Sequence, residues 1–226
     1  MRKAVSIILL AVVGYYLFNV FLNMPFGEKR EGVGKYYLEN TLDETGAVNT
    51  VTAIVVSYRG FDTLGEVTVL FLAATGLGAI LFDKRGKKRR HQYASLIVRV
   101  TSNMLYPMIV LLGAYVFVHG HLTPGGGFQG GSIIATGVLL MFMSYRKFEA
   151  NHTALSVIES LAGLTFVTVG LGGLIYGSSF LYNYLPLGQP GDLISAGVIP
   201  IIYIAVGFKV GAELSGVLDT MLKTIR

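Results

Sequence analysis

The chain has 226 residues, of which 53% are hydrophobic and only 14% are charged. A soluble domain usually carries about 25% charged residues, so this chain has too few to cover a water-facing globule. Its sequence contains no cysteine, which excludes disulfides, iron–sulfur ligation by this chain and thiol nucleophiles. The net charge of +5 does not indicate nucleic acid as a partner, because the basic residues lie mainly at the ends of hydrophobic blocks.

Apolar residues fall in blocks long enough to cross a bilayer as helices, which takes about 20 residues each. We therefore predict an all-α integral membrane protein with about six transmembrane helices. The first block is expected to be retained, because no small-residue cleavage site follows it. The stretch 23–49 is expected to be an external loop. The predicted spans cover about residues 4–22, 62–82, 94–118, 132–145, 153–176 and 192–214.

Two irregular segments interrupt these blocks. The second hydrophobic region is long for one span and is broken by Arg59-Gly60-Phe61-Asp62, so we expect a broken or re-entrant segment near residues 50–62. A Gly-rich loop is expected at residues 119–131, since its proline and glycines permit backbone conformations closed to other residues. Such backbone is tolerated at membrane depth only when it is buried in protein or lines a wet cavity. The sequence leaves open whether this loop is re-entrant or a surface turn.

The basic residues predict the topology, because cytoplasmic loops are enriched in lysine and arginine. With a cytoplasmic N-terminus, six spans put four basic groups on the same side of the membrane. We therefore expect a multi-pass protein of the cell membrane with both termini in the cytoplasm. The four groups are Arg2/Lys3, the cluster at 84–90, Arg146/Lys147 and Lys223/Arg226.

Charged residues inside a span are costly, so each is a candidate for the ion path. Arg59, Asp62 and Glu66 are three or four residues apart and share one helix face. A carboxyl group in apolar surroundings takes up protons more readily, which makes Glu66 the better proton or sodium carrier. Asp62 and Arg59 then form its electrostatic frame, and Na⁺ is expected transiently at Asp62 and Glu66. The alternative is that Asp62 caps a helix and Arg59 reaches the headgroups.

Three further charged residues complete the candidate ion path. Lys209 and Glu213 are four apart, and they either extend this path or form an interfacial salt bridge. Glu159 is either a half-channel carboxylate or a residue of a subunit contact. His119 and His121 are either polar residues at headgroup level or proton relays. The candidate residues of the Gly-rich loop are His119, His121, Pro124, Gly125, Gly126, Gly127 and Phe128.

Two motifs resemble a known family. The residues from Tyr58 to Glu66 resemble the "RGFDTLGE" signature of the C-terminal region of the large A subunit of Mrp-type cation/proton antiporters, and of the corresponding small subunit of membrane-bound hydrogenases. The residues from Gly120 to Gly131 resemble the "GH…PGGGF.GG" signature of the B subunit. The resemblance implies a fusion of an MbhE-like two-helix module (1–83) with a B-like four-helix module (93–226), joined by a basic cytoplasmic linker (84–92).

The resemblance also implies a function. Such a chain is a membrane subunit of an Mrp-type module that exchanges sodium for protons, with Glu66 and Asp62 lining the cation path. Pro124 and Phe128 shape the loop of the B-like module. Na⁺ is the transported ion, and no catalytic, metal-binding or cofactor motif occurs in the sequence. Because the large antiporter-like domain of the A subunit is missing, the chain is not expected to transport ions or catalyse a reaction alone.

The partners implied are other Mrp-type membrane subunits, including a large antiporter-like one, and the lipid bilayer. The fusion favours a redox-driven respiratory complex of hydrogenase or sulfur-reducing type, in which iron–sulfur and hydrogenase-like subunits are further partners. The first alternative is a subunit of a free-standing Mrp antiporter. The second is a non-transporting membrane scaffold that docks partner subunits.

Overall fold

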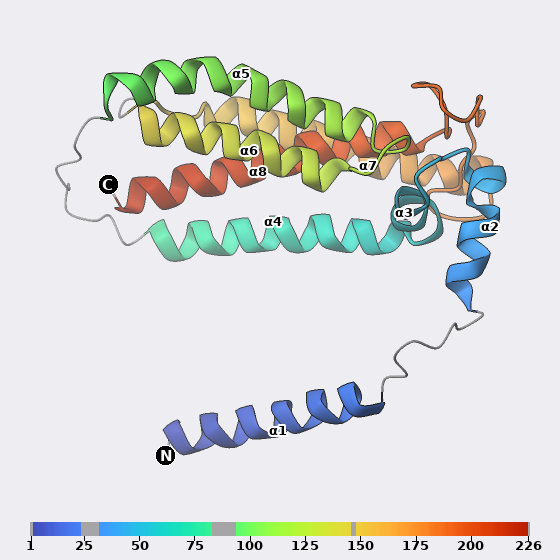
Figure 1. The fold of residues 1–226 in the computed structure, drawn as a ribbon, viewed down its shortest axis with the longest axis horizontal. Coiled ribbons are helices and arrows are strands. Elements are labelled where there is room, and N and C mark those ends of the chain that lie inside the picture. The colour runs from blue at the N-terminus through green and yellow to red at the C-terminus, as the bar shows by residue number, and fades with distance from the viewer. Residues whose placement is uncertain (1, 24–31, 83–93, 146–147, 226) are drawn as a thin grey trace. The chain divides into compact units, whose positions relative to one another are not determined.

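The computed structural model describes residues 2–23, 32–82, 94–145 and 148–225, and these form helices and loops without strands. The prediction of an all-α protein is confirmed. Figure 1 shows the helices, which are α1 (Arg2–Asn23), α2 (Val33–Thr45), α3 (Thr50–Ala53), the π-helix η1 (Ile54–Tyr58), α4 (Gly60–Phe82), α5 (Leu96–Val118), α6 (Gly127–Ser144), α7 (His152–Tyr176) and α8 (Ile199–Ile225).

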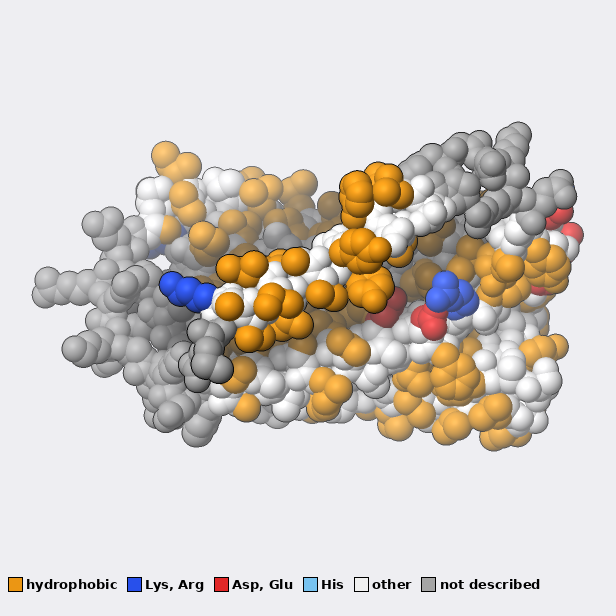
Figure 2. All heavy atoms as spheres, turned by 90° about the horizontal axis from the view of Figure 1, so that it is seen from below, with side chains coloured by type: hydrophobic (Ala, Val, Ile, Leu, Met, Phe, Trp, Pro, Cys, Tyr) orange, Lys and Arg blue, Asp and Glu red, His pale blue; other side chains and the backbone are white. Residues whose placement is uncertain are grey.

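Six of the described helices, α1, α4, α5, α6, α7 and α8, are long and apolar enough to cross a membrane. This confirms the predicted number of spans. On the face shown in Figure 2, hydrophobic side chains are widely spread, whereas the coloured charged side chains lie at a few places. Exposed apolar surface of this extent is what lipid-facing helices require.

The chain divides into two compact units, residues 1–35 and 36–226. In the first unit, the described helix is α1, whose side chains are exposed along its length from residue 3. In the second unit, α8 is the central helix, because α4, α5, α6 and α7 all pack against it. Helices α5 and α6 also pack closely on each other, as Figure 1 shows.

Glycines allow the backbones of α5, α6 and α8 to approach. A Cβ atom on Gly130 of α6 would lie 2.5 Å from the carbonyl oxygen of Gly113 in α5, and one on Gly131 would lie 2.7 Å from that of Gly207 in α8. Small residues at helix contacts let helices pack by close van der Waals contact in a membrane. The glycines of α6 therefore fix its distance from both neighbours.

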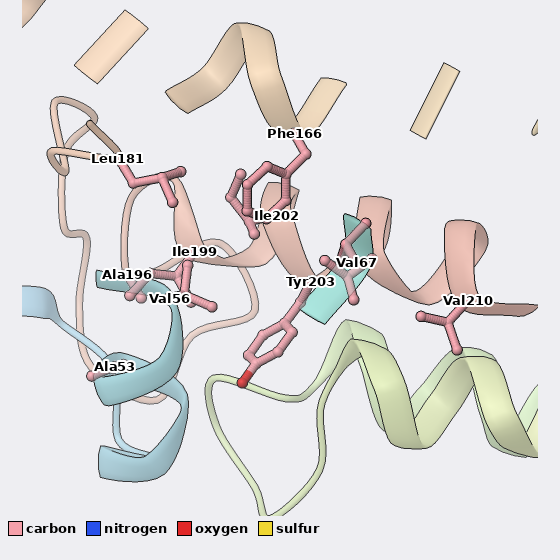
Figure 3. Packing of buried hydrophobic residues seen from close by; sticks show 12 residues of the cluster. Ala53, Val56, Val67, Phe166, Leu181, Ala196, Ile199, Ile202, Tyr203 and Val210 are labelled. Atoms are coloured by element: carbon pink, nitrogen blue, oxygen red, sulfur yellow. The ribbon is translucent and has the colours of Figure 1, made fainter. Parts of the chain in front are cut away.

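The buried core of the second unit joins the broken helix to α8. Ala53 of α3, Val56 of η1 and Ile199 of α8 are at most 1% exposed. Figure 3 shows these residues around the start of α8, with Val67 of α4 beside Tyr203. The core therefore holds the irregular segment against the central helix.

The predicted boundaries need three corrections. Helix α2 lies where a loop was expected, and α8 covers Ile199–Ile225 instead of about 192–214. Ala196 and Gly197 have positive φ angles, which a helix cannot continue through, and Pro200 suits the first turn of a helix. The Gly-rich segment is a loop only at 119–126, because α6 begins at Gly127. The basic linker at 84–92 lies outside the described residues.

Candidate ion-path site

The segment near residues 50–62 is broken as predicted. A four-residue α-helix leads into the π-helix η1, and Arg59 interrupts the helix with φ −128° and ψ 39°. Helix α4 then begins at Gly60. Single π-turns within helices occur often at functional sites.

The start of this segment is held by the Gly-rich loop. The side-chain amide of Asn49 donates hydrogen bonds to the carbonyl oxygens of Gly120 and Thr123, both at 2.9 Å. The Thr52 hydroxyl donates to the Gly120 carbonyl at 2.5 Å. The Asn49 carboxamide oxygen also accepts bonds from the backbone of Val51 and Thr52, which caps α3. The main-chain carbonyl groups of the Gly-rich loop therefore bind the start of the broken segment.

Arg59 and Asp62 lie together as their spacing predicted, and they form an ion pair. Their side chains are 63% and 51% exposed, so neither is buried within this chain. Glu66 is one turn further along α4 and is also exposed. It does not join that pair.

Three charged residues inside the spans form one group, which we call the Lys209 cluster: Lys209, Glu159 and Glu213. The Lys209 amine lies 3.3 Å from a carboxylate oxygen of Glu159 in α7 and 3.3 Å from one of Glu213 in α8. The side chains of Lys209 and Glu213 are only 10% and 2% exposed. The amine also lies 5.4 Å from the centre of the Phe71 ring in α4. Three helices thus meet at one buried lysine.

The contact of His152 with Asp219 was not predicted as a site. The Nε2 atom of His152, at the start of α7, lies 2.5 Å from a carboxylate oxygen of Asp219 near the end of α8. The Asp219 side chain is 3% exposed and that of His152 is 55% exposed. An aspartate in the mostly apolar stretch from Val217 to Leu222 was the sequence signal that could have found it.

A groove of about 220 Å³ connects the two charged groups; we call it the α8 groove. It lies over α8 between α4 and α7, and its lining includes polar side chains from all three helices. In the described residues no group of three or more His, Asp or Glu side chains is placed to hold a metal ion. The polar residues lining the groove are Thr75, His152, Ser156, Glu159, Glu213 and Thr220.

The residues of the Gly-rich loop have different surroundings. The His119 ring stacks on Tyr115 of α5, with ring centres 4.3 Å apart, whereas His121 is fully buried. Gly126 caps α6 with φ 154°, a backbone conformation that favours glycine. Pro124 and Gly125 lie in the turn before it, and Gly127 and Phe128 form the first turn of α6.

Burial sets the protonation of His121. It lowers the pKa of the imidazole below its ordinary value of 6.5, and the charge of His119 acts in the same direction. The backbone of Asp192 and Leu193 lies against the ring and opposes this shift. His121 is therefore most stable as a neutral side chain.

A carboxylate of α2 that the sequence analysis did not single out links α2 to η1 by a hydrogen bond. Glu44 accepts hydrogen bonds from the hydroxyls of Tyr36 and Tyr58, both at 2.5 Å. Burial and this carboxylate raise the pKa of Tyr58 to about 12, and the two hydroxyls lower the pKa of Glu44. The contact holds α2 beside the π-helix.

Comparison with protein families gives two matches along this chain. Residues 97–216 match a domain described as related to the MnhB subunit of Na⁺/H⁺ antiporters. Residues 1–94 match the MbhE family, described as the E subunit of MBH. An uncharacterized protein of Methanocaldococcus jannaschii is 30% identical, over 92% of this chain and 88% of its own length.

Two solved structures are similar over nearly the whole chain. A chain of the membrane-bound sulfane sulfur reductase, an archaeal respiratory membrane complex, is 45% identical with a TM-score of 0.83, covering 98% of both chains. A chain of the Mrp complex from Dietzia sp. is 27% identical with a TM-score of 0.78, over 97% of this chain but 26% of that one. Similarly, a probable A/B subunit of a K⁺/H⁺ antiporter from Rhizobium meliloti is 28% identical over 76% of this chain and 20% of its own length.

Proposed function

This chain belongs to the family of membrane proteins with a domain related to the MnhB subunit of Na⁺/H⁺ antiporters, and we propose that it supplies part of the ion path in an Mrp-type module. The Lys209 cluster is the observation that carries this proposal. Lys209 lies near the middle of the candidate span Ile199–Leu222. Ionisable groups at that depth are costly and mark ion and proton pathways. The cluster has two carboxyl groups for one amine, so one more proton or monovalent cation neutralises it.

Polar residues extend from this cluster toward the other end of the spans. Glu66 is five residues from Phe71 along α4, and Tyr203 is six residues from Lys209 along α8, distances of about 7 and 9 Å. Figure 3 shows that the Tyr203 hydroxyl points toward the segment before α6. This arrangement supports Glu66 as an ion carrier, with Asp62 and Arg59 as its frame and Na⁺ as the transported ion.

The stretch between Lys209 and Tyr203 is apolar. Val206, halfway between them on α8, is 2% exposed, and Val67 of α4 is 4% exposed. The path proposed here therefore has two polar halves separated by a dry segment.

The proposed assembly is a redox-driven respiratory complex with other Mrp-type membrane subunits, including a large antiporter-like one. Support comes from the sulfane sulfur reductase chain, which this chain matches from end to end. In the assembly proposed for this chain, the redox chemistry belongs to iron–sulfur and hydrogenase-like partners, and this chain is not an enzyme by itself. We further propose a plasma-membrane location with both termini cytoplasmic, and two modules, 1–83 and 93–226, joined by the linker 84–92.

The free-standing antiporter is the second candidate. The matching region is only 26% of the Dietzia chain and 20% of the Rhizobium protein, so in those proteins it is part of a much longer polypeptide. Identifying the proteins that co-purify with a tagged chain separates the two assemblies. Soluble redox subunits in the purified complex support the respiratory assembly, and their absence beside antiporter-like subunits supports the free-standing one.

The ion-path proposal is tested with Glu213→Gln, which removes one carboxylate while Glu159 still pairs with Lys209. We expect the complex to assemble and sodium-dependent proton exchange in membrane vesicles to fall at least about tenfold, the effect of about 1.4 kcal/mol on a barrier. Glu66→Gln tests the other half of the path in the same assay. Glu39→Gln, on the exposed side of α2, is the control and should leave exchange unchanged. Normal exchange in both ion-path variants would favour the scaffold function instead.

A further inference from the structure

We propose that the α8 groove is a water-filled vestibule through which a monovalent cation reaches the Lys209 cluster, and that His152 and Asp219 form its mouth. The proposal rests on the proposed function, because it concerns how ions enter that path. The vestibule would open on the side where α7 begins and α8 ends, which is the cytoplasmic side in the proposed topology.

The walls of the groove are suited to a small cation. Residues with side-chain oxygen atoms line it from three helices: Thr75 in α4, Ser156 and Glu159 in α7, and Glu213 and Thr220 in α8. Hard cations prefer oxygen ligands. The volume of about 220 Å³ also accommodates several water molecules around an ion.

Glu213 provides a separate indication of a ligand. It lines the groove and is only 4% exposed. One of its oxygens pairs with Lys209, but the other is buried and has no hydrogen-bond partner among the described residues. A buried carboxylate oxygen without a partner is costly, and a cation or water in the groove would satisfy it.

The depth of the groove matches a half-channel. Glu159 is seven residues beyond His152 on α7, and Glu213 is six residues before Asp219 on α8, so both lie about 10 Å from the mouth. Lys209 lies ten residues before Asp219, about 15 Å deep, which is half of a hydrocarbon core of about 30 Å. The vestibule therefore ends where the apolar segment around Val206 begins.

The mouth is a side-chain contact between His152 and Asp219 that joins the start of α7 to the end of α8. His152 is half-exposed and Asp219 is buried, so one partner contacts solvent while the other faces the protein interior. This pair holds the two helix ends together at the edge of the groove. An entering cation would pass beside His152, which lines the groove and contacts the buried Asp219 carboxylate.

The natural absence of cysteine gives a direct test, because an introduced thiol is the only one in this chain. Ser156→Cys puts it in the groove, and Ser160→Cys, one turn along the same helix and exposed outside the groove, is the matched control. The assembled complex in sealed vesicles is treated from each side with membrane-impermeant methanethiosulfonates, one cationic and one anionic. The intact mass of the tagged chain reports the modification.

We expect Ser156→Cys to react from the cytoplasmic side, about tenfold faster with the cationic reagent, because an acidic cleft concentrates cations. Ser160→Cys should stay unmodified, since it faces lipid or a partner. Replacing N-methylglucamine by sodium at equal ionic strength should slow the reaction at Ser156→Cys. Equal reactivity of the two thiols, or reaction only from the opposite side, would overturn the vestibule.

A plug in the groove gives a second measurement. A Cβ atom on Gly216, which lines the groove, meets no heavy atom within 4 Å, so Gly216→Leu should be accepted and fill the space. We expect this variant to slow modification of Ser156→Cys at least about tenfold, since the cavity no longer concentrates the reagent. Gly163→Leu is the control, because Gly163 is also an open position but lies on α7 outside the groove, and it should not slow this modification. Unchanged modification behind the plug would overturn the proposal.

These outcomes separate the vestibule from the proposed function. A reactive Ser156→Cys together with normal exchange by Glu213→Gln and Glu66→Gln would support the vestibule and contradict the ion path. Loss of exchange in those variants with an unreactive Ser156→Cys would retain the path and overturn this entrance.

Discussion

The protonation and the contacts of single side chains in this protein depend on burial as much as on charge. His121 is fully enclosed in the loop before α6, and burial lowers its pKa. The Lys209 cluster lies at mid-span and keeps its charged groups in contact, which is how buried charges are tolerated. Each of these sites is expected to respond differently to substitution.

The His121 site predicts a stability that depends on pH. Its folded-state pKa is below the value of 6.5 in the unfolded chain, so the unfolded chain binds the proton first as the pH falls. The stabilisation of the folded state by neutral His121 is fully present above about pH 6.5 and is lost as the pH falls below that value. Thermal unfolding of the purified complex, measured on both sides of pH 6.5, should show this loss.

His121→Asn should flatten the pH dependence, although it also lowers the melting temperature at neutral pH. His119→Asn is the control, because that ring stacks at the surface of the loop and its charge lowers the pKa of His121 less than burial does, so most of the pH dependence should remain. A wild-type profile that matches that of His121→Asn would contradict the assignment.

The sequence could predict some site contacts and not others. The spacing of four residues was enough to pair Lys209 with Glu213, since such residues face each other on a helix. Glu159 lies 50 residues away in sequence from Lys209, and only the packing of α7 on α8 brings it to the amine. Asp219 was missed because the last helix was expected to end near residue 214, which left it in a tail.

At the level of helices, close glycine contacts are the main packing feature. Gly130→Ala would put a methyl group 2.5 Å from the carbonyl oxygen of Gly113, so α5 and α6 must move apart. We expect a loss of about 1–3 kcal/mol in stability, seen as a lower melting temperature in detergent. Gly163→Ala, at an open position, should leave the melting temperature unchanged or slightly higher. Equal effects of the two changes would contradict this packing role.

The number of spans could be predicted because bilayer thickness sets the length of an apolar helix. Helix α2 was missed because it is short and polar, which makes it resemble a loop. The start of α8 was misplaced because residues 193–198 are mostly apolar although they form a loop. The positive φ angles at Ala196 and Gly197 that end this loop depend on contacts with other segments, including the Asn183 side chain that bonds Val198.

At the level of the whole chain, the two proposed modules are joined by more than the linker. Helix α4 packs on α8, and the carbonyls of Gly120 and Thr123 bind Asn49. Neither contact could be predicted from hydropathy, because the hydrophobic pattern does not define which helices are neighbours. We therefore expect the two proposed modules to stay associated without a covalent connection.

A protease site inserted within the linker 84–92 tests this recognition. After cleavage, the fragments 1–83 and 93–226 should still co-purify in mild detergent. Combining the cut with Asn49→Ala should release the fragments at least about fivefold faster, because the cap and its bonds contribute about 1–2 kcal/mol. Asn40→Ala, which loses a bond only to Tyr36 within α2, is the control. Immediate separation of the wild-type fragments would show that the linker holds them.

The valines beside Tyr203 have an electrical consequence. Val206 and Val67 are almost completely buried, so the resting protein offers no continuous wet conduit through the stretch they occupy. A continuous water-filled path would conduct ions and would dissipate the membrane potential even when the complex is not active. In the proposed path each ion instead stays at one polar end until the apolar segment rearranges. Protein motion therefore limits the current, and the proposed path does not conduct until that motion occurs.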